Sequence, residues 1–147
     1  MNAPLKILAA GLVGLLVGLP AAQAQDDFIP VTDVLIKLGT AKSDSTIQPR
    51  EITLQAGELY RFVVSNTSKS THIVAVPEFR KTVFTAELVK WYPLDYPVAV
   101  LSPEISLQPG DTMEWTFIAL KEGTYKLGCD DPVHAAAGMH AIINVVS

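Results

Sequence analysis

The chain of 147 residues contains a single cysteine, Cys129, and so forms no disulfide within itself. Histidine is also scarce, with three residues, and the 11 basic residues are outnumbered by 15 acidic ones. This acidic balance argues against nucleic acid or anionic lipid as a partner, because both carry negative charge. A basic protein partner would suit such a surface.

The longest apolar run, ILAAGLVGLLVGL, lies close to the N-terminus. It follows Lys6 and precedes Pro20 and the small-residue site Ala22-Gln23-Ala24, which is the anatomy of a secretory signal peptide. The run is short for a bilayer span, although an uncleaved membrane anchor is the alternative. We predict a signal peptide at 1–24 and a mature domain at 25–147 that is periplasmic and not membrane-bound.

Export would place the single thiol, Cys129, in an oxidising compartment. A free thiol in an oxidising compartment is open to oxidation unless it is buried, paired with another chain or bound to a metal. Removal of Lys6 also leaves 10 basic against 15 acidic residues, a net charge of −5. The mature chain is therefore an acidic single domain whose Cys129 needs an explanation.

Alternating apolar and polar residues, separated by turn residues, fill most of the mature chain. Such segments with period-two alternation are typical of half-buried β-strands. We predict about seven strands packed as an all-β, Greek-key antiparallel β-sandwich. The segments are 33–38, 51–66 with a turn at Gly57, 71–77, 105–120, 123–129 and 139–146.

One stretch, 78–91, breaks this alternation. Its apolar residues fall close to helical spacing, with charged residues elsewhere on the surface. Pro77 immediately before it suits the first position of a helix. We therefore predict one short helical insertion over about 78–91, followed by an extended linker at 92–97.

The C-terminal third gathers the residues with the most specific chemistry. Cys129, His134 and Met139 have the spacing C-x4-H-x4-M, between two predicted strands that bracket a loop at one end of the sandwich. His72 starts another predicted strand. A thiolate, two imidazoles and a thioether favour copper over hard cations, and copper ligation would also shield the thiolate. Zinc is a poorer match, because methionine is a poor zinc ligand.

Each of these residues also has a structural explanation. Cys129 and Met139 could be buried apolar side chains, and His72 could bond a neighbouring hydroxyl. A metal-free sandwich that serves as a binding module therefore stays open as an alternative. His140 alternates away from Met139 on the last strand, so we expect its ring to point outward.

The pattern GxYxLxC, followed by x4-H-x4-M and preceded at a distance by a histidine after an Asn-containing turn, resembles the cupredoxins, or small blue copper proteins. The resemblance extends from about the first strand to the C-terminus, with a loop length similar to that of rusticyanin and auracyanin. It implies one copper ion held by His72, Cys129 and His134 in a plane, with Met139 as the axial ligand. Ile73 stands where many members have Asn or Ser, and His140-Ala141 replaces the usual x-Gly.

The resemblance implies a periplasmic type 1 copper protein that carries single electrons. Its expected partner is a redox protein such as a c-type cytochrome or a copper oxidoreductase, and nothing in the sequence demands more than a monomer. Copper tolerance, through sequestration or delivery, is the alternative that the predicted insertion suggests. An enzyme of the multicopper oxidase or nitrite reductase type would need a further histidine cluster, and only His140 remains. We therefore do not expect an enzyme.

Overall fold

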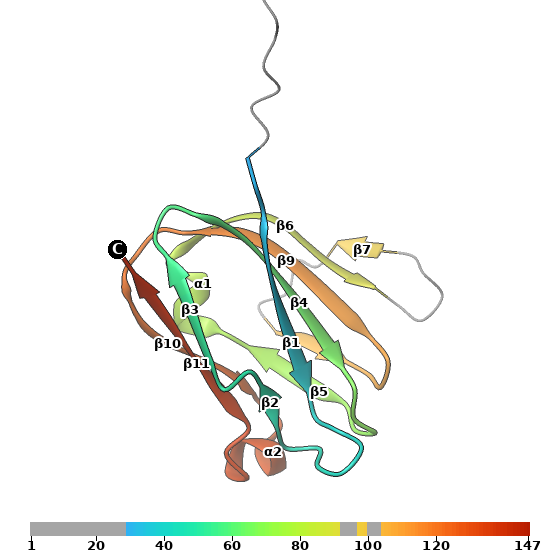
Figure 1. Cartoon of the computed structure of the whole chain (residues 1–147). Helices are drawn as coiled ribbons and strands as arrows, with labels where there is room; N and C mark the ends of the chain where they lie inside the picture. The colour runs from blue at the N-terminus through green and yellow to red at the C-terminus, as the bar shows by residue number, and fades with distance from the viewer. Residues whose placement is uncertain (1–28, 92–96, 100–103) are drawn as a thin grey trace, which may run out of the picture.

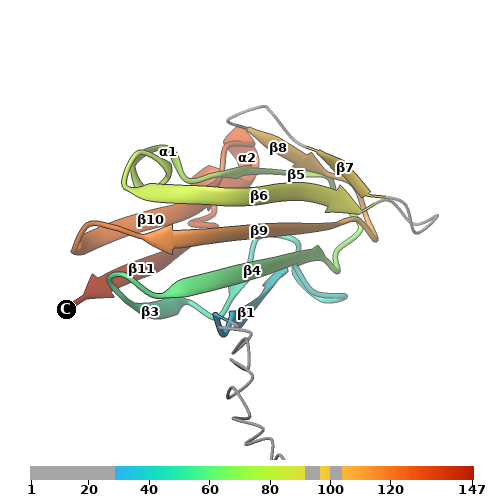
Figure 2. The ribbon, with the colours of Figure 1, turned by 90° about the horizontal axis from the view of Figure 1, so that it is seen from above.

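A computed structural model describes residues 29–91, 97–99 and 104–147, and the predicted signal peptide lies outside them. The described chain forms two β-sheets packed face to face, as the alternation predicts (Figures 1 and 2). Within these ranges, neither helix is long and apolar enough to cross a membrane. Of the predicted linker at 92–97, only Pro97 is described, at the start of a strand.

The described residues form eleven strands and two short helices. The elements are β1 Thr32–Leu38, β2 Ile47–Gln48, β3 Glu51–Gln55, β4 Leu59–Asn66, β5 His72–Ala75, α1 Pro77–Arg80, β6 Val83–Trp91, β7 Pro97–Ala99, β8 Ile105–Leu107, β9 Thr112–Ala119, β10 Gly123–Cys129, α2 Pro132–Ala136 and β11 His140–Val146. The strand order is β2-β1-β4-β9-β6-β7 in one sheet and β3-β11-β10-β5-β8 in the other.

Most neighbouring strands are antiparallel, but two pairs are parallel. β1 runs parallel to β4, and β3 runs parallel to β11. These N-terminal strands each add to a different sheet, and so the first quarter of the described chain ties both layers together. Local alternation predicts the strands and their buried faces, but it carries no information on the relative direction of distant strands.

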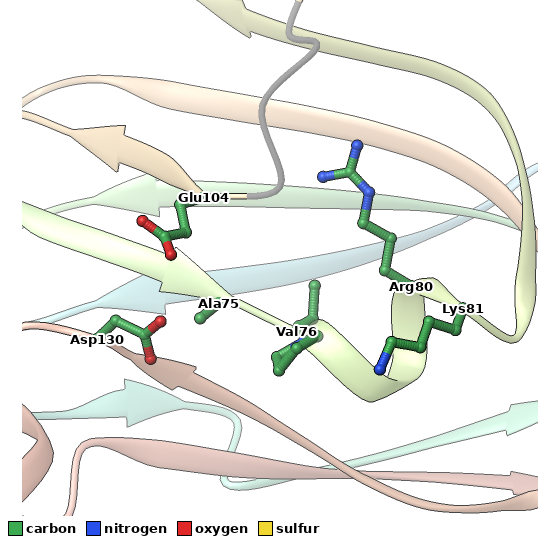
Figure 3. Close-up of a pocket in the computed structure, with 7 residues that line it drawn as sticks. Ala75, Val76, Arg80, Lys81, Glu104 and Asp130 are labelled. Carbon is green, nitrogen blue, oxygen red and sulfur yellow. The ribbon is translucent and has the colours of Figure 1, made fainter.

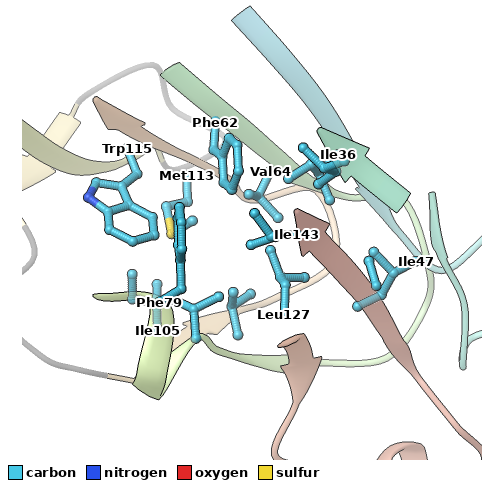
Figure 4. Close-up of a cluster of buried hydrophobic side chains, with 14 of the residues drawn as sticks. Ile36, Ile47, Phe62, Val64, Phe79, Ile105, Met113, Trp115, Leu127 and Ile143 are labelled. Atoms are coloured by element: carbon cyan, nitrogen blue, oxygen red, sulfur yellow. The ribbon is translucent and has the colours of Figure 1, made fainter. Parts of the chain in front are cut away.

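The core lies between the two sheets and contains the residues that alternation assigns to it. Phe62 and Val64 of β4 lie beside Trp115 and Met113 of the paired strand β9, and all four are buried on the side of this sheet that meets the other one (Figure 4). Phe117 of β9 is also buried there. The opposite layer contributes alternate residues of β10 and β11. The buried residues there are Leu127 and Cys129 of β10, Met139 just before β11, and Ala141, Ile143 and Val145 of β11. Cys129 therefore sits at one end of the apolar core.

The predicted helix over 78–91 is wrong in its extent. α1 begins at Pro77, as expected, but it is a single turn that ends at Arg80, and 83–91 is the strand β6. Phe79 anchors the turn, since its fully buried ring packs against Phe62 and Phe117. The β-branched and aromatic residues of β6 suit a strand, and pairing with β9 overrides their helical spacing.

Candidate metal centre

Three of the four predicted ligands meet at the end of the sandwich where β10 stops and β5 starts. His72, Cys129 and His134 form the group of potential metal donors found in the described residues. The Sγ atom of Cys129 lies 3.8 Å from Nδ1 of His72 and 3.7 Å from Nδ1 of His134. The two Nδ1 atoms are 3.2 Å apart. The structure thus brings together three of the four residues that the sequence suggests as metal ligands.

The triangle of donor atoms has the size that a metal ion needs. With sides of 3.8, 3.7 and 3.2 Å, the point equidistant from the three atoms is about 2.1 Å from each. Bonds from a first-row metal to histidine nitrogen are about 2.0–2.1 Å long, and bonds to cysteine sulfur are slightly longer. The residues therefore fit a metal in the plane of one sulfur and two nitrogens, which is the arrangement of blue copper sites.

The neighbouring strand holds Cys129 from its backbone. The amide of Ile73 donates to Cys129 Sγ at 3.4 Å, and the carbonyl of Ile73 accepts from the amide of Asp130 at 2.9 Å. The apolar side chain of Ile73 replaces an expected hydrogen-bonding one, and these two backbone contacts brace the cysteine instead. An amide N–H donated to a thiolate stabilises its negative charge.

His134 is carried by the short helix α2, which is closed at both ends. Asp131 caps its N-terminus, since Oδ1 accepts from the amides of Val133 and His134. At its C-terminus Gly138 adopts a left-handed conformation, with φ of 76°. The amide of Gly138 donates to Ala135, and that of Met139 donates to His134, which is a Schellman motif.

The same hydrogen bonds join the three C-terminal candidate ligands. The amide of Met139 donates to the carbonyl of His134 at 3.1 Å, and the amide of Cys129 donates to the carbonyl of Met139 at 3.2 Å. The exposed guanidinium of Arg50 donates to the carbonyls of Gly138 and His140, on either side of Met139. Met139 is 1% exposed. Its backbone is therefore fixed beside the cluster.

Burial favours the neutral form of His72, which is the form that binds a metal. The residue has no exposed surface, and this burial lowers the pKa of its imidazole below the usual value, with the neighbouring His134 acting in the same direction. Asp44 and Asp131 oppose the shift but do not reverse it. A neutral imidazole has a free lone pair, so the ring needs no deprotonation before it binds.

Four residues that support the site escaped the sequence analysis: Arg50, Asn66, Ser68 and Asp131. One of them had a readable signal, because Asp-Pro followed by a glycine six residues later is a pattern of helix start and stop. Asn66 belongs to the Asn-containing turn of the sequence pattern, but the contacts of Arg50, Asn66 and Ser68 depend on how distant strands and loops are placed. His140, which we expected to point away, is not among the clustered donors.

One hollow of the surface lies beside this cluster. A cavity of about 360 Å³ is lined by Arg80 and Lys81 on one side and by Glu104 and Asp130 on the other, with Ala75 among the apolar residues between them (Figure 3). It contains no histidine, cysteine or methionine. A second hollow, of about 320 Å³, is lined by Cys129 together with Lys126 and Ala135, so the cysteine of the cluster borders it.

The sandwich and its buried Cys-His-His triangle define the class of small copper-binding domains. A family model of copper binding proteins, the plastocyanin/azurin family, matches residues 34–146. The chain therefore belongs to this family, as the sequence resemblance implied, and its cofactor is copper. No curated protein sequence matches the chain significantly.

Solved structures share the fold at low sequence identity. Auracyanin from Roseiflexus castenholzii, reduced with dithionite, is 20% identical, with a TM-score of 0.54 over 79% of this chain and 98% of that one. Auracyanin A from Chloroflexus aurantiacus is also 20% identical, with a TM-score of 0.52 over 80% of this chain and 100% of that one. The McoA multicopper oxidase from Aquifex aeolicus is 13% identical, with a TM-score of 0.58, over 80% of this chain and 30% of that one.

Proposed function

We propose that the mature chain is a periplasmic, mononuclear type 1 copper protein that carries single electrons between redox partners. The observation that carries this proposal is the buried triangle of one thiolate and two imidazoles, braced by hydrogen bonds from two strands and a capped helix. Copper, when bound, supplies the reversible one-electron step. Met139 would be the weak axial ligand, because the neighbouring backbone bonds hold it at the site.

The protein's part in such a reaction is to hold the ligands still. His72 and Cys129 are buried, and the hydrogen bonds around them hold the donor atoms in one arrangement. A ligand set that does not move between oxidation states lowers the reorganisation that accompanies electron transfer. This role requires no substrate pocket and no acid–base pair, and we therefore propose a carrier and not an enzyme.

His134 offers the route for electrons. Its side chain is 12% exposed, whereas Cys129 is 5% exposed and His72 fully buried. Exposed apolar residues of α2 and its C-terminal end surround it: Pro132, Val133, Ala135, Ala136 and Ala137. We call these five residues the apolar rim. A flat rim of small side chains lets another redox centre approach the imidazole edge closely.

The expected partner is a basic redox protein such as a c-type cytochrome, with the chain acting as a monomer. The net charge of −5 after signal cleavage supports this choice, because opposite charges speed association. Sequencing the N-terminus of the exported protein would test cleavage after Ala24. An intact N-terminus would refute the predicted signal peptide.

The docking role of the apolar rim can be tested with Val133→Glu. Val133 is 73% exposed, so the variant should keep its fold and its visible spectrum. We expect its second-order rate of electron exchange with a c-type cytochrome to fall at least about tenfold, because a charge is desolvated at the contact.

Leu120→Glu is the matched control for this test. Leu120 is 62% exposed and lies just after the end of β9, at the end of the sandwich opposite α2 (Figure 1). Leu120→Glu adds the same charge away from the apolar rim. The rate of electron exchange of this variant with the cytochrome should therefore stay near that of the natural chain. Equal rates for both variants would contradict docking at the rim, and no exchange by the natural chain would refute the carrier role.

A further inference from the structure

The ring nitrogen of His72 that faces away from the metal triangle has a hydrogen-bond partner of its own. Nε2 lies 2.8 Å from Oγ of Ser68, and both residues are buried, with 0% and 6% exposure. A ring nitrogen and a hydroxyl can each donate or accept, so the contact alone does not say which atom carries the proton. The other hydrogen-bond partners of the Ser68 hydroxyl determine which atom carries the proton.

Asn66, at the end of β4, fixes the direction of the hydrogen bonds. Its Nδ2 donates to the carbonyls of Ser70 and Leu107, at 2.8 and 2.9 Å. Its Oδ1 must then face Ser68, where it accepts from the backbone amide at 3.0 Å and lies 2.8 Å from the hydroxyl. A flipped amide would set two N–H groups against the donors of Ser68 and its oxygen against two carbonyls. The orientation is therefore determined by its surroundings.

The hydroxyl of Ser68 has carbonyl-type acceptors for its proton on the side away from His72. One is Oδ1 of Asn66 and the other is the carbonyl of Ser70, at 2.8 and 3.1 Å. The amide of Ser70 in turn donates to the hydroxyl oxygen at 3.2 Å. Once the hydroxyl proton is directed at either acceptor, the oxygen can only accept from His72, and Nε2 must carry the imidazole proton.

We propose that Ser68 and Asn66 are positioning residues that set the tautomer and ring orientation of His72 for copper. The inference rests on the proposed copper site, and it assigns a task to two residues that touch no metal. With the proton on Nε2, Nδ1 presents its lone pair toward Cys129 and His134, which are its neighbours at 3.8 and 3.2 Å. The other tautomer would point a proton into the metal position.

The loop from 67 to 71 is itself tied down, so the arrangement is present before metal binds. Ser70 Oγ donates to Asp44 Oδ2 at 2.6 Å, and Thr67 Oγ1 donates to the carbonyl of Gly39 at 2.8 Å. Ser68 therefore acts from a loop fastened to the segment after β1. The metal-binding form of His72 should be the major form in the metal-free protein.

Nitrogen-15 NMR of the metal-free mature chain tests this directly, because long-range proton–nitrogen correlations show which ring nitrogen is protonated. At a pH where His72 is neutral, we expect the natural chain to carry the proton on Nε2. Ser68→Ala should give a mixture of tautomers, whereas Ser68→Thr, which keeps the hydroxyl, should retain the natural one. Copper affinity should fall about 10- to 100-fold in Ser68→Ala, as is usual when a group behind a metal ligand is removed.

Ser65→Ala is the matched control, because the Ser65 hydroxyl also bonds a side chain, Thr112 Oγ1 at 3.1 Å, but belongs to no chain leading to His72. It should leave both the tautomer and the affinity unchanged. A proton on Nδ1 in the natural chain, or an unchanged tautomer in Ser68→Ala, would overturn the inference. If Ser68→Ala does not fold, the tautomer of the natural chain decides alone. Absence of a copper–thiolate band in the natural chain would instead refute the proposed function, whatever the tautomer.

Discussion

At the scale of single residues, Ile73 shows that a backbone group can replace a side chain. The resemblance to cupredoxins leads us to look for a hydrogen-bonding residue after the first histidine, and this chain has isoleucine there. The structure supplies the bracing through the amide and carbonyl of Ile73, which bond Cys129 Sγ and the Asp130 amide. Residue identity alone cannot predict such contacts, because every residue type except proline carries the same backbone N–H and C=O groups.

The ligands themselves were predictable for the opposite reason. Thiolate, imidazole and thioether are rare side chains here, so their types and their short spacing after a strand carry most of the information. Asn66 and Ser68 are common residue types in an ordinary turn, and they gain a role only from the placement of His72. The candidate metal ligands can therefore be predicted from sequence, whereas the residues that hydrogen-bond to those ligands can be identified only from the fold.

Met139→Leu tests the axial position. Leucine fills a similar volume but offers no sulfur, so the plane of His72, Cys129 and His134 should keep its copper and its intense visible band. We expect the reduction potential to rise, because loss of an electron-pair donor destabilises the more highly charged Cu(II) more than Cu(I). Cyclic voltammetry of the purified protein measures this shift. Met113→Leu, in the buried core of β9, is the control and should leave the potential unchanged.

At the scale of elements, α2 does more than connect two strands. Its Asp131 cap and Gly138 turn fix a helix of five residues, and the turn bond from Met139 to His134 makes two candidate ligands part of one rigid unit. The strand pattern predicts a loop between Cys129 and Met139, although Asp131-Pro132 and Gly138 are start and stop signals of a helix. The alternation of apolar and polar residues predicts most of the strands. It does not predict a strand at 83–91, because that segment is a strand through its pairing with β9.

β6 also carries an inward-facing charge that joins the two sheets. Lys90 Nζ lies 2.6 Å from Asp111 Oδ2 and donates to the carbonyl of Ser106 on β8 at 2.8 Å. The side chains of Lys90 and Asp111 are 11% and 3% exposed. Asp111 also accepts from the amide of Gln108, so its carboxylate organises the turn before β9. Lys90 thus links β6 to β8 of the other sheet through Ser106, and to the turn before β9 through Asp111.

Lys90→Met should be strongly destabilising, because it leaves the Asp111 carboxylate buried without its cation. The expected loss in the free energy of unfolding is about 3–5 kcal/mol, the usual cost of breaking a buried pair from one side. Urea titration followed by tryptophan fluorescence measures it. Lys81→Met removes the exposed partner of Glu78 and should change stability little. A loss equally small for Lys90→Met would contradict the structural role of this pair.

At the scale of the whole molecule, the two sheets form a rigid frame with the donor atoms at one end. β5 and β10 belong to one sheet, and the loop that holds Ser68 follows a strand of the other, so the metal triangle is supported from both layers. The parallel pairs β1–β4 and β3–β11 complete the frame. This is the part of the fold that the sequence could not predict, because pairing direction between distant strands leaves no local pattern.

Whether Cys129 binds copper can be measured by a Cu(II) titration of the reduced mature chain, followed by visible absorption. We predict an intense thiolate-to-copper band that saturates at about one equivalent, as one Cys-His-His site requires. The band should be absent in Cys129→Ser, which keeps a small side chain at the same place. If no band forms in the natural chain, or if it persists in Cys129→Ser, then Cys129 does not bind copper and the proposed electron carrier is wrong.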